Sequence, residues 1–130
     1  ITKPFYLRKA NNEIQQFDII TAWEVLEHIA EVDLPQLFAN IKNHLTDEGY
    51  FVGSIANWDD IDPVSGVNWH VTVHLYEWWA DKFSNAGFKI CTEDFAVIDL
   101  ARGGYNPPHC YEQPYPEVDL ERSLYIAVNK

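Results

Sequence analysis

The chain has 130 residues, is 47% hydrophobic and 15% aromatic, and carries a formal net charge of −11. This composition predicts one folded domain over residues 1–130 with a modest core, and it excludes a disordered chain. The acidic balance argues against direct contact with nucleic acid or an anionic membrane, because both are bound mainly through lysine and arginine.

The strongest pattern in the chain begins at Phe17 and ends at His28. Residues 17–23 form an apolar run rich in β-branched residues, which predicts a strand buried on both faces. Glu24, Glu27 and His28 follow at the i, i+3 and i+4 spacing that places side chains on one side of a helical turn. Because open α/β sheets bind ligands beyond the carboxyl ends of their strands, this turn is a candidate site. A solvated acidic surface is the alternative.

A helix and a second strand are predicted next. Residues 34–45 have an apolar stripe at helical spacing, with Asp33 as the expected N-cap and Gly49 as the expected stop. Residues 50–55 read as a second buried strand. Residues 57–68 predict a loop, and its aspartates favour a solvated loop over a metal site, since the EF-hand ligand pattern is absent.

The last third of the chain alternates between strand and helix signals. Residues 69–74 alternate as a strand does, and residues 76–86 have the spacing of a helix. Residues 88–100 and 124–128 predict two further strands. Between them, residues 103–116 are rich in glycine and proline and predict an irregular segment.

Three segments in order resemble one protein family. Residues 17–29, FDIITAWEVLEHI, resemble the fourth-strand motif of class I S-adenosylmethionine-dependent methyltransferases. Residues 45–52, LTDEGYFV, are similar to the turn and fifth strand of that family, and residues 70–88 resemble its later segment ending in Ala-Gly-Phe. The resemblance implies an α/β, Rossmann-like half-domain: a mainly parallel sheet with an antiparallel C-terminal strand pair.

The resemblance also implies the cofactor, S-adenosylmethionine. The family binds it chiefly through a glycine-rich loop after the first strand and an acidic residue ending the second strand. Residues 1–16 resemble neither, and at most hold a remnant of the third strand. The chain therefore looks like the C-terminal half of a longer enzyme and is expected to be inactive by itself. The end of the family's fourth strand touches the methionine part of the cofactor, which implies cofactor-binding roles for Ala22, Trp23 and Glu24. Plain core packing is the alternative for Trp23.

The implied reaction is methyl transfer to an oxygen or nitrogen of a small-molecule acceptor. His28 matches a histidine on the family's substrate side and is the candidate catalytic residue, as a base or an orienting group. Trp58, Trp69 and His70 are the candidate substrate-binding residues, because aromatic side chains suit a flat or sugar-like acceptor. The alternative for His28 is a structural role as a brace for the helix. The alternative for Trp69 and His70 is packing within the loop.

Two other functions stay open. One is a non-catalytic methyltransferase-like module completed by a partner chain. The other is a metal-dependent RNA 2′-O-methyltransferase. Glu24, Glu27, His28 and His74 resemble the pattern of carboxylates and imidazoles that could hold a metal ion in that class of enzyme. That pattern also occurs in metal-free relatives and the chain is acidic, so we assign no metal ligands from the sequence.

The remaining expectations concern location and partners. Two cysteines, Cys91 and Cys110, indicate reduced thiols in a cytoplasmic protein. No apolar run approaches the roughly 18 residues of a membrane span, and no signal peptide is visible. In the family the fourth strand pairs with the first, so residues 17–23 would expose an unpaired edge. This predicts a homo-oligomer or pairing with a missing N-terminal half.

Overall fold

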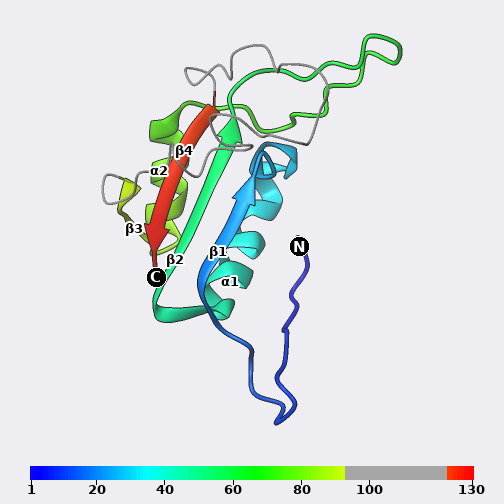
Figure 1. The fold of residues 1–130 in the computed structure, drawn as a ribbon. Helices are drawn as coiled ribbons and strands as arrows, with labels where there is room; N and C mark the ends of the chain where they lie inside the picture. The colour runs from blue at the N-terminus through cyan, green and yellow to red at the C-terminus, as the bar shows by residue number, and fades with distance from the viewer. Residues whose placement is uncertain (93–122) are drawn as a thin grey trace, which may run out of the picture.

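The computed structural model describes residues 1–92 and 123–130 and centres on a four-stranded sheet with two helices on one face (Figure 1). The strands are β1 (Phe17–Trp23), β2 (Leu45–Ala56), β3 (Lys89–Ile90) and β4 (Ser123–Asn129), in the spatial order β1-β2-β4-β3. β1 and β2 are parallel, whereas β4 is antiparallel to both β2 and β3. The α/β class and the antiparallel C-terminal pair are thus confirmed.

Both helices contribute to one core with the sheet. The helices are α1 (Leu34–His44) and α2 (Tyr76–Asn85), and short 3-10 turns, η1 (Leu26–His28) and η2 (Glu31–Asp33), precede α1. The ring of Phe38 on α1 lies 4.5 Å from that of Phe83 on α2, measured between centroids. Phe83 in turn stacks at 5.5 Å on Phe51 of β2. The helices predicted over residues 34–45 and 76–86 are confirmed, because their apolar stripes meet at this layer.

β1 forms the edge of the described sheet, and the prediction of a strand buried on both faces is wrong. Ile20 and Ala22 pack toward the helices. On the strand's outer side, Phe17 is 39% and Ile19 56% exposed. The apolar run identifies a strand, but no local signal tells whether a second layer covers its other face. Among the described residues β1 pairs with β2 alone, as expected for an unpaired edge.

Two further boundaries differ from the sequence prediction. Residues 69–74 form no strand, because the amides of Val71 and Thr72 donate to the Glu27 carbonyl of η1 and not to a neighbouring strand. Gly49 does not end α1, which stops at His44, and the chain enters β2 directly. The predicted loop over residues 57–68 is confirmed, apart from one bridge between Ile61 and Asn68. The predicted features over residues 93–100 and 103–116 lie outside the described residues.

Residues 1–16 lie beside α1 and not in the sheet, so the third-strand interpretation is wrong (Figure 1). The Asn40 side-chain amide donates to the carbonyls of Ile1 at 2.7 Å and Lys3 at 2.9 Å. The Leu7 amide donates to His44 Nε2 at 2.9 Å. These bonds hold the segment on the helix. No helix in the described part of the chain is long and apolar enough to cross a membrane.

Candidate functional site

The candidate site begins where β1 ends. Glu24, the next residue, has a left-handed backbone with φ of 52°, which is uncommon for a residue with a side chain. Its amide donates to the Ser54 carbonyl of β2 at 3.0 Å. The chain therefore turns sharply out of the sheet into η1. Glu24 is not on the helical turn that holds Glu27 and His28. The prediction that all three side chains share one side of a helical turn is therefore wrong for Glu24.

Glu27 is a fully buried carboxylate, and neither of its oxygens has a hydrogen-bond partner among the described residues. Its backbone carbonyl accepts from the amides of Val71 at 2.9 Å and Thr72 at 3.0 Å. The Thr72 hydroxyl also donates to the Ile29 carbonyl at 2.7 Å. These bonds tie the segment before α2 to η1. A buried polar group without a partner is costly and calls for a functional explanation.

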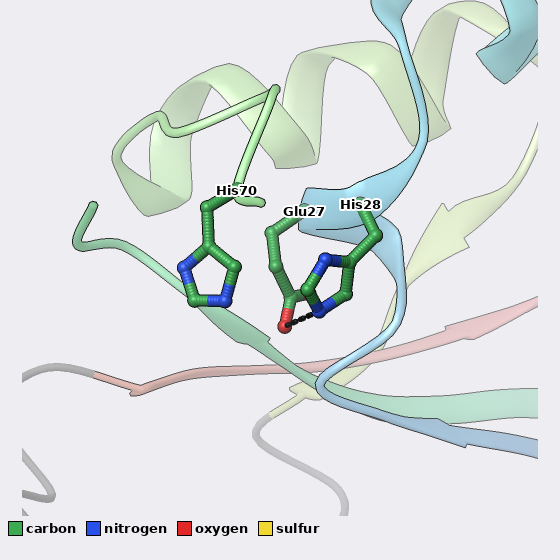
Figure 2. Close-up of side chains that lie close together, drawn as sticks. All are labelled: Glu27, His28 and His70. Atoms are coloured by element: carbon green, nitrogen blue, oxygen red, sulfur yellow. Dashed lines mark ion pairs between the residues drawn. The ribbon is translucent and has the colours of Figure 1, made fainter. Parts of the chain in front are cut away.

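Two imidazoles face this carboxylate (Figure 2). His28 Nε2 lies 3.9 Å from Glu27 Oε1. His70 comes from the segment after the 57–68 loop, and its ring centroid lies 4.8 Å from that of His28. One ligand atom each of Glu27, His28 and His70 lies within 4.8 Å of the other two. His70 is buried, whereas the His28 side chain is 42% exposed, so the cluster opens to solvent on the His28 side.

Backbone carbonyls hold both imidazoles in the same tautomer. His28 Nδ1 lies 2.8 Å from the Trp69 carbonyl oxygen, and His70 Nδ1 lies 2.6 Å from that of Trp58. A carbonyl oxygen can only accept, so each Nδ1 carries the hydrogen and donates it. Each neutral ring then presents the lone pair of Nε2 on its other side. With both rings neutral and the Glu27 carboxyl ionised, the cluster consists of hydrogen-bond acceptors with no donor among them.

The structure gathers most of the residues assigned to the site from sequence. They form two groups: His28, Trp58, Trp69 and His70 around Glu27, and Ala22, Trp23 and Glu24 at the end of β1. The tryptophans were singled out for their rings, yet their carbonyls make the described contacts to the histidines. The Trp58 ring also meets the His70 ring at 5.7 Å, and the Trp69 side chain is 55% exposed.

Two assignments change. The sequence placed Glu27 on the candidate turn and in the metal alternative but gave it no role of its own, although its place beside His28 was the signal that could have found it. His74, the fourth member of that alternative, lies elsewhere. Its Nε2 is 2.8 Å from Glu31 Oε1, and its ring stacks on Trp78 at 3.8 Å. His70, four residues earlier, takes its place beside Glu27.

Burial raises the pKa of the Glu27 carboxyl above its ordinary value of 4.5, and the negative charge of Glu24 adds to the rise. At a pH above the pKa that Glu27 has in the folded protein, the buried carboxylate is ionised and destabilises the fold. This destabilisation disappears as the pH falls through that pKa toward 4.5, the ordinary value expected in the unfolded chain.

We expect Glu27→Gln to increase the free energy of unfolding at pH 7 by about 1–2 kcal/mol, which raises the melting temperature by a few degrees. The gain should shrink to near zero at about pH 4, where the wild-type carboxyl is protonated in both states. Thermal melts of the full-length protein across this range, with chelator so that no cation neutralises the carboxylate, measure it. Glu48→Gln, at an exposed position, controls for the loss of one charge. A lower melting temperature for Glu27→Gln at pH 7 would contradict the prediction.

Known proteins provide an independent comparison. A family model described as "Methyltransferase domain" matches residues 1–95. The chain belongs to this family. Among solved structures, the methyltransferase domain is similar to a TehB-like SAM-dependent methyltransferase from Corynebacterium glutamicum ATCC 13032 Kitasato, with a TM-score of 0.51 and 16% identity. The match covers 89% of this chain and 48% of that chain, so the domain spans about half its length. A search of curated proteins finds no significant match.

Proposed function

We propose that this methyltransferase domain is the acceptor-side half of an enzyme that methylates an oxygen or nitrogen of a small molecule. The observation that carries the proposal is the cluster of a fully buried Glu27 carboxylate with the Nε2 lone pairs of His28 and His70. Such a set of hydrogen-bond acceptors binds an O–H or N–H group of the substrate, because that group supplies the missing hydrogen-bond donor. A substrate methylated at a C–H group would leave the cluster unsatisfied.

The chemistry needs one proton acceptor. In methyl transfer a lone pair of the acceptor forms a bond to the methyl carbon, the carbon–sulfur bond breaks in line, and its electron pair goes to sulfur. The acceptor atom becomes cationic unless its proton leaves. In our proposal His28 Nε2 takes that proton, because His28 is the exposed member of the cluster. The Trp69 carbonyl on Nδ1 and the Glu27 carboxylate 3.9 Å from Nε2 stabilise the resulting imidazolium.

S-adenosylmethionine, when bound, supplies the methyl group from a sulfonium cation. The end of β1 fits its positively charged methionine part. Trp23, Ser54 and Tyr125 are neighbours across three strands at this edge, and Ser54 Oγ is buried without a partner among the described residues. Glu24 adds a carboxylate nearby. The pKa of Tyr125 is raised mainly by burial of Tyr125 and further by the negative charge of Glu24. We propose that Ala22, Trp23 and Glu24 hold this part of the cofactor, and that the remaining half of the enzyme holds the rest.

Composition supports the acceptor class and the location. A net charge of −11 favours a small molecule over nucleic acid as the acceptor. The low cysteine content supports a cytoplasmic enzyme. The open edge of β1 supports pairing with the remaining half of the enzyme or with a second copy.

An acceptor screen tests the proposal. The full-length enzyme is incubated with S-adenosylmethionine labelled in its methyl group and with small alcohols, phenols, amines and carbon acids, and the products are read by mass spectrometry. We expect methyl transfer to oxygen or nitrogen. Transfer only to carbon would refute the acceptor class, and tight cofactor binding with no transfer to any acceptor would favour the non-catalytic alternative.

A further inference from the structure

We propose that Glu27, His28 and His70 form a site for one divalent transition-metal ion. Their ligand atoms lie within 4.8 Å of one another, the one such cluster among residues 1–92 and 123–130. An ion with bonds of about 2.0–2.1 Å in tetrahedral geometry holds its ligands roughly 3.4 Å apart. The widest separation in the cluster therefore needs to shorten by about 1.4 Å at most, a side-chain adjustment, to meet that geometry.

A cation explains the unpaired carboxylate better than a proton does. Three lone-pair atoms facing one another can be satisfied by a shared proton or by a metal ion. Sharing a proton between His28 Nε2 and Glu27 Oε1 requires a separation below about 3.2 Å, but the observed distance is 3.9 Å. A metal ion between them requires the wider spacing. It would also neutralise a carboxylate whose two oxygens have no partner among the described residues.

The surroundings of the two histidines match those of metal ligands. A metal-binding histidine usually donates its second ring nitrogen to a carbonyl or carboxylate, which fixes the ring. Here the Trp69 and Trp58 carbonyls do this for His28 and His70, at 2.8 and 2.6 Å. Glu27 and His70 are buried, and His28 is the open side through which an ion would enter. The site is thus prearranged by its backbone.

The ligand set selects the class of ion. Two imidazole nitrogens and one carboxylate oxygen suit zinc, cobalt, ferrous or manganese ions. Magnesium and calcium prefer sites built from oxygen. Three protein ligands leave at least one coordination position for water or for another oxygen ligand.

A cobalt titration tests the site. Full-length protein is stripped with chelator, returned to chelator-free buffer and titrated with Co²⁺, whose visible absorption reports its coordination. We expect one saturable equivalent, displaced by Zn²⁺ and not by excess Mg²⁺. His28→Ala and His70→Ala should each weaken binding by at least about 100-fold, because even the loss of an outer-shell partner costs about 10- to 100-fold. Circular dichroism confirms that each variant is folded.

His74→Ala is the matched control, since His74 is bonded to Glu31 outside the cluster. We expect it to bind Co²⁺ as the wild type does. No saturable absorption change in the wild type would overturn the proposal. Binding unaffected by His70→Ala, or abolished by His74→Ala, would also overturn it.

The ion would use the lone pairs that otherwise take up a proton, so the metal-loaded form of His28 is a ligand and not a base. The titration requires no cofactor and no acceptor. Its failure would leave the proposed methyl transfer to oxygen or nitrogen intact. Conversely, transfer to carbon in the acceptor screen would refute the proposed function and leave the ion site standing.

Discussion

Replacing His28 with alanine should lower the turnover of the full-length enzyme by about 100-fold or more, the usual contribution of a positioned acid–base group. The affinity for S-adenosylmethionine should change little, because the proposed cofactor residues lie at the end of β1 and not in η1. Turnover measured at saturating acceptor and cofactor affinity measured by calorimetry separate the two effects. Unchanged turnover with a cognate acceptor would reduce His28 to a brace for its turn.

His74→Ala is the matched control for this experiment. It removes an imidazole of the same size whose contacts are with Glu31 and Trp78, so its turnover should stay near that of the wild type. Repeating the wild-type assay with chelator separates the two proposed states of His28. Turnover that survives chelator assigns His28 as a base, whereas turnover that is lost and restored by Zn²⁺ or Co²⁺ assigns it as a ligand.

Replacing Gly53 with alanine should destabilise the protein by about 3 kcal/mol, near the upper end of the usual cost of overpacking. Gly53 pairs with Ala22 across β1 and β2. A β-carbon at Gly53 would overlap the Ala22 carbonyl oxygen and lie 3.4 Å from the Phe51 ring. The clash is with backbone, so relief requires β1 to move away from β2, and that movement would displace Trp23 and Glu24 as well.

The measurement is a thermal melt of the full-length protein, where we expect the melting temperature to fall by roughly 10 °C. Gly66→Ala is the control, because no atom beyond the two adjoining residues lies within 4 Å of the added β-carbon, so its positive φ of 73° is the main penalty. That variant should lose only about 1 kcal/mol. Equal losses for the two variants would contradict the steric argument.

The order and type of most elements follow from the sequence alone. Residues 17–23 read as a strand because they form a short apolar run rich in β-branched residues, and residues 34–45 read as a helix because their apolar residues recur at helical spacing. The same local pattern placed His28 at the carboxyl end of β1, where α/β sheets bind ligands. Sequence motifs also predicted the methyltransferase family, which the family match confirms. All of these signals lie within a few consecutive residues.

The composition of the site was decided by tertiary structure. The sequence grouped His74 with Glu27 in the metal alternative and assigned His70 to substrate binding. The choice is made by two backbone bonds, from Val71 and Thr72 to the Glu27 carbonyl, between segments more than forty residues apart. They place His70 against the carboxylate and leave His74 free to pair with Glu31. Periodicity cannot encode such long-range pairing, because the pairing depends on where the segment that follows the loop after β2 meets η1.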